Sequence, residues 1–288
     1  MARRISVVIG LVLAFIVAGL LITALQKGRL NANMDASRNN LRQLAFFAAH
    51  HSNPNPGPDA KPPFRIDVPK LPSEIPAATA VLPGVRVEER LSWVVRVLPA
   101  LDQKRHPVEQ LLTQIQFDQP WPAEPNQLAG RTRLAVMLCP ENTPLVPPGS
   151  PAMTSYVGIA GIGPDAATIA LPQGLPTPPR AGAFRFDAAT PFDRITDGLS
   201  QTLLMGETAD SPGPWLQGGR STTRGLDDSA GAKPFIGTGG QFGGYFPHST
   251  NFAICDGSVR TFTHRVTPAV LLKLATIAGG PADGIVEE

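Results

Sequence analysis

Few residues in this sequence have the type and spacing that chemistry requires. The two cysteines, Cys139 and Cys255, lie too far apart for the Cys-x-x-Cys spacing of a zinc site. Asp197 and Asp256 each precede a glycine, in turns where an aspartate commonly bonds the local backbone. Calcium binding by these two carboxylates and a purely local role in the turns therefore both stay open as interpretations.

Motifs of well-known enzyme classes are missing from the sequence. It contains no Gly-x-Ser-x-Gly elbow, no His-Glu-x-x-His pair and no Gly-x-x-x-x-Gly-Lys phosphate loop. The glycine-rich segment 237–244 lacks the strand-to-helix context of a phosphate-binding loop, and we interpret it as a surface loop. The sequence thus predicts no catalytic or cofactor-binding residue and a non-enzymatic protein. A hydrolase with an unrecognised motif is kept as an alternative.

The amino-acid composition of the chain indicates which partners and which secondary-structure elements to expect. The formal net charge is +2 over 288 residues, and no basic patch alternates with aromatic residues, so we expect no nucleic-acid partner. The 28 glycines and 31 prolines disfavour helices and favour short strands joined by long loops.

The N-terminal segment from Ile5 to Leu25 is apolar and carries no charge. As a helix it would measure about 31 Å, which matches a hydrocarbon core of about 30 Å. The apolar run is longer than that of a cleaved signal sequence, and it lacks a small-residue cleavage site. We expect residues 1–25 to be an uncleaved, single-pass transmembrane anchor that contacts membrane lipid.

The helix is predicted to continue as an amphipathic segment over residues 26–52. Apolar residues recur there at spacings of three and four, which is typical of a helix packed on a partner surface. This helix packing stripe comprises Leu30, Met34, Leu41, Leu44 and Ala48, with Ser37 among them. The two segments would form one rod from Ile5 to about His51, and prolines from Pro54 onwards would end it.

We divide the rest of the chain into a Pro-rich linker or arm, residues 53–90, and a globular β-rich domain, residues 91–288. Helices are predicted at 106–115 and 268–278, whereas residues 91–98 fit either a strand or a helix. Strands are predicted at 133–139, 154–158, 200–207, 251–255 and 258–262. The last two flank a two-residue Asp-Gly loop, a strong hairpin signal. The fold class is therefore α+β, with one long N-terminal helix packed on a mostly antiparallel sheet with long loops.

Two interpretations of the cysteines stay open. Cys139 and Cys255 each end an apolar run. If these runs are neighbouring strands, a disulfide between the two residues is sterically feasible in an oxidising compartment. The alternative is a pair of buried thiols that pack as small apolar side chains.

Several blocks of the sequence occur in the same order as in a known family. The blocks cover residues 39–44, 92–99, 117–121, 138–140, 154–158, 195–207 and 251–260. They resemble the large bacterial family of unknown function catalogued as family 10 solute-binding proteins, which are pilin-like, have a prepilin-type N-terminus and carry a C-terminal His…Asp-Gly motif. The resemblance implies a pilin-like fold, with the N-terminus inside the inner membrane and the domain outside it. It implies other pilin-like subunits or a secretion platform as partners.

Three features of this sequence differ from that pattern. No glycine precedes the prepilin junction, and Ile9 stands where prepilins have a glutamate. The family's histidine falls at Phe246 here, and His248 follows two residues later. Counting positive charges alone mildly favours the opposite orientation in the membrane. We therefore hold two hypotheses: an accessory pilin or pseudopilin-like component of a secretion or envelope assembly, and a solitary membrane-tethered binding module.

Overall fold

The computed structural model describes residues 2–50, 74–101, 108–142 and 146–280. The longer helices and the strands are α1 (Ala2–His50), β1 (Glu74–Ile75), α3 (Val108–Gln114), α4 (Glu124–Gly130), β2 (Tyr156–Ile162), β3 (Thr190–Pro191), β4 (Leu203–Glu207), β5 (Thr223–Leu226), β6 (Ser249–Ile254), β7 (Val259–Thr263) and α5 (Pro268–Ala275). The single-turn helices are η1 (Val87–Glu89), α2 (Val94–Val97), η2 (Leu98–Ala100), η3 (Ala135–Met137), η4 (Ala166–Thr168), η5 (Phe192–Arg194), η6 (Leu199–Gln201) and η7 (Gly219–Ser221). This is the α+β class predicted from the sequence.

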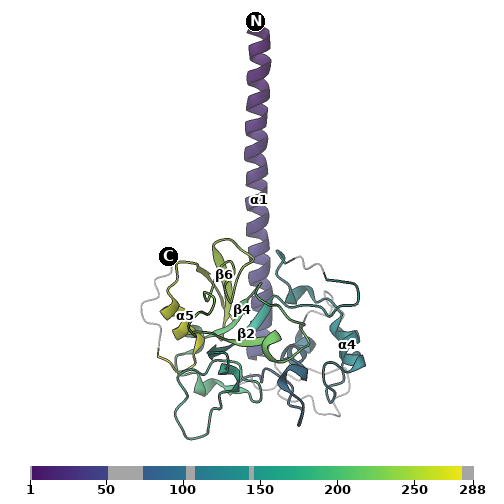
Figure 1. Cartoon of the computed structure of the whole chain (residues 1–288), viewed down its shortest axis with the longest axis vertical. Helices are drawn as coiled ribbons and strands as arrows, with labels where there is room; N and C mark the ends of the chain where they lie inside the picture. Colours follow the sequence, from purple (N-terminus) through teal and green to yellow (C-terminus); the bar gives the residue numbers. More distant parts are fainter. Residues whose placement is uncertain (1, 51–73, 102–107, 143–145, 281–288) are drawn as a thin grey trace.

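Helix α1 is a continuous rod of 49 residues that projects from the domain (Figure 1). No proline removes a backbone donor from it, so the helical hydrogen bonds continue throughout. The predicted continuous rod is confirmed, and its predicted end at His51 lies outside the described residues. Residues 10–29 are exposed, and the helix is long and apolar enough to cross a membrane, by length and composition.

The domain is built on a five-stranded sheet with the order β5-β2-β4-β6-β7. Strands β2 and β5 are parallel, and every other neighbouring pair is antiparallel. In the pair β2–β4, Tyr156 lies directly opposite Glu207, so both side chains emerge on the same face of the sheet. The pairing of β4 with β6 has an irregularity between Leu203 and Met205.

Helices cover both faces of this sheet. Helix α1 contacts β4, β6 and β7, and α5 contacts β2, β4 and β5. The side chains of the strands divide between two apolar clusters accordingly. Tyr156, Met205 and Ala253 belong to the cluster that includes the buried half of α1. Val157 and Phe252 belong to the cluster that includes α5.

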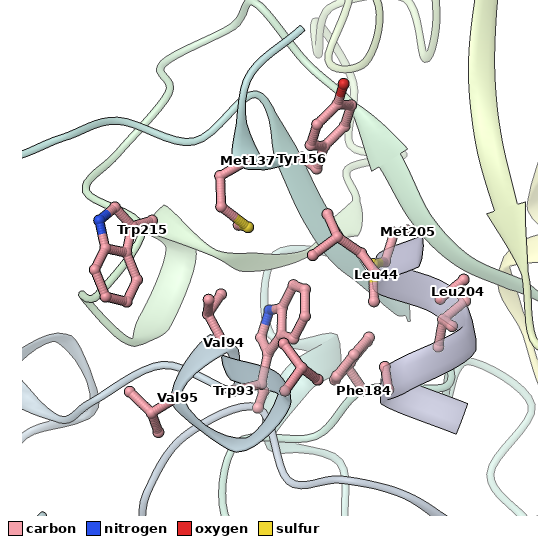
Figure 2. Close-up of a cluster of buried hydrophobic side chains, with 14 of the residues drawn as sticks. Leu44, Trp93, Val94, Val95, Met137, Tyr156, Phe184, Leu204, Met205 and Trp215 are labelled. Atoms are coloured by element: carbon pink, nitrogen blue, oxygen red, sulfur yellow. The ribbon is translucent and has the colours of Figure 1, made fainter. Parts of the chain in front are cut away.

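The larger cluster centres on aromatic side chains beneath α1. Trp93 is fully buried, its ring centroid lies 5.4 Å from that of Phe184, and its indole nitrogen donates a 3.0 Å hydrogen bond to the carbonyl of Thr222. Figure 2 shows Leu44 of α1 and Met205 of β4 beside this aromatic pair. Of the predicted packing stripe, Leu41, Leu44 and Ala48 are fully buried, and Leu30 and Met34 are partly buried against the same cluster.

The segment predicted as a strand at 133–139 forms the single-turn helix η3 instead, so that prediction is wrong. The carbonyl groups of Ala135 and Leu138 accept hydrogen bonds from the Asn40 side chain, and that of Met137 accepts one from the backbone of Ser155. Partners from α1 and from the residue just before β2 therefore replace the neighbouring strand that a sheet would supply.

Three other segments refine the predictions. Residues 91–98, which fitted either a strand or a helix, contain helix α2. The hairpin β6–β7 is confirmed, but its loop has three residues rather than two. The backbone N–H of Ile254 donates to the carbonyl of Ser258, which leaves residues 255–257 as the loop. Gly257 closes it with a φ of 84° and an N–H that donates to the carbonyl of Ile254. Part of the predicted linker is folded: β1 pairs with β3, and Ile75 is fully buried.

Candidate functional site

Polar side chains from four elements meet where α1 crosses the sheet. Ser37 comes from the packed half of α1, Tyr156 from the start of β2, Glu207 from the end of β4 and Asn251 from β6. Cys139, which follows η3, lies close enough to them for Glu207 and Ser37 to influence the pKa of its thiol. All five side chains are fully buried. We call these five residues the buried polar cluster.

The Glu207 carboxyl is the centre of the cluster. Its Oε2 accepts a 2.8 Å hydrogen bond from the Ser37 hydroxyl and a 3.2 Å bond from the Asn251 side-chain amide. Its Oε1 accepts a 2.8 Å bond from the backbone N–H of Asn251. The carboxyl therefore joins α1 to β6 through strand β4, and none of these three donors is a cation.

Further hydrogen bonds orient the side chains that bond Glu207. The hydroxyls of Ser37 and Tyr156 are 3.0 Å apart, and either can be the donor. The Asn40 amide, one turn further along α1, contacts the Tyr156 hydroxyl at 3.4 Å. On the other side, Thr261 of β7 donates a 2.6 Å bond to the Asn251 side-chain oxygen. One row of hydrogen bonds thus crosses from α1 through the sheet to its edge strand.

Burial dominates the electrostatics of the cluster. It raises the pKa of Glu207 from 4.5 to about 7, although the hydrogen bonds from Asn251 and Ser37 act in the opposite direction. It also raises the pKa of the Cys139 thiol to about 12 and holds the pKa of Tyr156 well above its usual value. Cys139 and Tyr156 are therefore neutral at physiological pH, and Glu207 is the member of the cluster that titrates there.

A serine, a thiol, a phenol and a carboxyl are residue types that catalyse reactions elsewhere. Here each of them has no exposed surface, so a substrate has no contact with them in this conformation. The thiol also lacks the lowered pKa that a nucleophilic cysteine needs. The arrangement satisfies buried polar groups and bonds α1 to the sheet.

The two cysteines are free and buried in the structure, which corresponds to the second of the two interpretations. Burial raises the pKa of Cys255 as well as that of Cys139. Both residues belong to the cluster under α1, where Cys139 also takes part in the buried polar cluster.

The two calcium candidates lie in separate loops and bond the backbone. The Asp197 carboxylate accepts hydrogen bonds of 2.8 Å and 3.0 Å from the N–H groups of Gly279 and Gly280. The Asp256 carboxylate accepts a 2.9 Å bond from the N–H of Ser258 within its own hairpin loop. Over the described parts of the chain, no group of three or more His, Cys, Asp or Glu side chains is arranged to hold a metal ion. The structure does not bring Asp197 and Asp256 together.

Sequence reasoning missed the buried polar cluster, although two signals for it were present. Ser37 is a polar residue in a stripe whose other members are apolar, and Glu207 ends an apolar strand. Each signal predicts a buried polar group that needs a partner. The sequence does not show that the two are each other's partner, because they lie 170 residues apart.

Comparison with known proteins gives a family and no function. The family model SBP_bac_10, described as protein of unknown function (DUF1559), matches residues 34–234, which is more than two thirds of the chain. The match starts after the apolar half of α1 and ends before the β6–β7 hairpin. No curated protein and no solved structure matches the chain. Four of the five cluster residues lie in the matched region, and the chain belongs to the SBP_bac_10 family of proteins of unknown function.

Proposed function

We propose that this protein is a single-pass protein of the bacterial cytoplasmic membrane that holds its domain outside the cell interior and acts without catalysis. In this proposal it is a pilin-like accessory component of a secretion or envelope assembly. The observation that carries the proposal is the division of α1. Its large apolar side chains between Leu11 and Leu25 are all more than half exposed, whereas Leu41, Leu44 and Ala48 are fully buried in the domain.

The short distance between these two parts of α1 supports a rigid attachment. Leu30 is already packed on the domain, five residues after Leu25. At about 1.5 Å per residue, the domain begins about 8 Å beyond the apolar segment, roughly the thickness of the headgroup layer. The domain would therefore lie close to the membrane surface, on a helix that is also part of its core.

The burial of the side chains whose types could take part in catalysis supports a role without catalysis. Serine, cysteine, tyrosine and glutamate are gathered in one place, and that place is sealed beneath α1. Three of these side chains also hold the helix, since Ser37 bonds both Glu207 and Tyr156. A hydrolase would need an opening to these residues or a different site.

The location and orientation can be tested with one introduced cysteine. Leu175 is 59% exposed on the domain, and both native cysteines are buried and hence protected from reagents. The variant Leu175→Cys should react with a membrane-impermeant maleimide in intact spheroplasts, and the wild type should not. Labelling of the variant only after lysis would place the domain inside the cell and reject the proposed orientation.

A solitary membrane-tethered binding module is the second candidate, and the residue at position 9 favours it. Prepilins carry a glutamate there that pairs with a neighbouring subunit, whereas this chain has Ile9. Cysteines introduced at the exposed positions Val12 and Ile16 should form disulfide-linked dimers in membranes if the helices of several copies pack together. Cross-linking no stronger than that of Leu175→Cys would reject the assembly and favour the solitary module.

A further inference from the structure

The buried carboxyl of Glu207 has a feature that helix packing alone does not require. An apolar residue on the sheet would hold the amphipathic half of α1 without the cost of burying an ionisable group. Instead, the end of β4 places a carboxyl in a fully buried position, bonded to Ser37 of the helix and to Asn251 of the neighbouring strand.

The hydrogen bonds around this carboxyl are compatible with both of its protonation states. When Glu207 is ionised, Ser37 donates to it and Tyr156 can donate to Ser37. When Glu207 is protonated, its O–H can donate to the Ser37 oxygen, and Ser37 can then donate to Tyr156, because either hydroxyl of that pair can be the donor. Reversing this row needs only rotation of hydroxyl hydrogens.

The two states differ in charge compensation. The ionised carboxylate receives three hydrogen bonds, but it has no cation among these partners, so its charge is buried with only dipoles to stabilise it. The titratable groups that influence or are influenced by it are Cys139, Tyr156 and Tyr245, and burial raises the pKa of each, so all three stay neutral near pH 7. The charged residues Glu141 and Arg224 act on Cys139 and Tyr245, one step further out.

From this geometry we propose that the Glu207 carboxyl is a proton-operated latch: the amphipathic half of α1 stays packed over it while the carboxyl is neutral, and ionisation favours release of this half, because release returns the buried charge to water. The latch is a property of the fold, so it holds whichever side of a membrane the domain occupies. It links the attachment of the domain to its helix with the pH of the surroundings.

Proton linkage gives the direction in which pH changes the stability and the pH range over which it does so. Burial raises the pKa of Glu207 from 4.5 to about 7, so the folded state binds this proton more tightly than the unfolded state does. The stabilisation is complete below about pH 4.5, declines as the pH rises, and is lost above about pH 7. The corresponding change in the ratio of folded to unfolded protein is roughly 300-fold.

The first test compares the full-length wild type with Glu207→Gln in detergent micelles, by chemical denaturation between pH 4.5 and pH 8. Glutamine keeps the shape of glutamate and does not titrate. The wild type should lose roughly 150-fold in its folding equilibrium constant relative to the variant over this range, because at pH 4.5 the carboxyl of the unfolded chain is itself half protonated. A parallel pH dependence of the two proteins would overturn the proposal.

Hydrogen exchange locates the effect. After correction for intrinsic rates, the amides of residues 41–49 in α1 should lose more protection between pH 5 and pH 8 than those of β2, and Glu207→Gln should lack this difference. Equal loss in α1 and β2 would show that the carboxyl acts on the whole domain and would contradict a latch.

A second variant keeps the proposal testable if Glu207→Gln does not fold. Ser37→Ala removes one donor that favours the ionised carboxylate, so it should shift the titration of Glu207 to higher pH. The infrared carbonyl band of the protonated carboxyl, in protein with isotope-labelled glutamate, reports this titration directly. A band that titrates at the same pH in the wild type and in Ser37→Ala would overturn the proposed role of Ser37.

Discussion

The two halves of helix α1 are joined without a break, yet they have opposite surroundings. Between Gly10 and Leu25 every described side chain is exposed, although most of them are apolar. Between Ser37 and Ala49 a single stripe is buried in the domain, while Asn39 and Arg42 on the other side are exposed. An all-round apolar surface and a narrow apolar stripe therefore mark different partners: a surrounding apolar medium in the first case and one face of a sheet in the second.

The largest effect is expected from a charge in the buried half. Leu41→Asp places a carboxylate where no solvent reaches, so it should destabilise the domain by about 4 kcal/mol or more. Asn39→Asp is the matched control, because it adds the same charge two residues away at an exposed position and keeps an acceptor for Arg42. Equal denaturation midpoints for the two variants would contradict the packing of this half on the sheet.

A charge in the exposed half should act on a different property. Ile16→Asp should make membrane insertion less favourable by about 3 kcal/mol, since an aspartate at the centre of a membrane helix costs about that much. The domain should keep its denaturation midpoint in detergent, because Ile16 lies in the exposed half of α1 and belongs to neither apolar cluster of the domain. Extraction of membranes with alkaline carbonate measures the first effect. A domain that unfolds in this variant would break the separation between the two halves.

Features that depend on residues close together in the sequence could be predicted, whereas those that depend on partners far apart in the sequence could not. The rod and its stripe were predictable, because a helix repeats every three to four residues and no proline interrupts it. The hairpin was predictable from Asp256-Gly257, whereas the length of its loop depended on the φ of Gly257. The strand predicted at 133–139 and the overlooked role of Glu207 have a common cause. In both cases the partner lies on α1, about a hundred residues or more away.

The smallest effect separates two neighbouring asparagines on the buried half. Asn40 donates a 3.0 Å hydrogen bond to the carbonyl of Leu138, whereas the exposed Asn39 bonds only Arg42 among the described contacts. Asn40→Ala should therefore cost about 1 kcal/mol of domain stability, and Asn39→Ala should cost less than about half of that. Urea denaturation of both variants checks the difference. Equal costs would mean that Asn40 does not support the segment around η3.

The division of α1 is tested most directly by spin labels along its length, in protein reconstituted into lipid vesicles. Labels replace Val12, Ile16 and Leu20 in the first half and Asn31, Asp35 and Asn39 in the second, all at exposed positions. The first three should relax strongly with oxygen, which concentrates in lipid, and the last three with a water-soluble nickel complex. If the nickel complex reaches Ile16 as readily as Asp35, the apolar half of α1 is not in the membrane, and the account of the helix as both anchor and core is wrong.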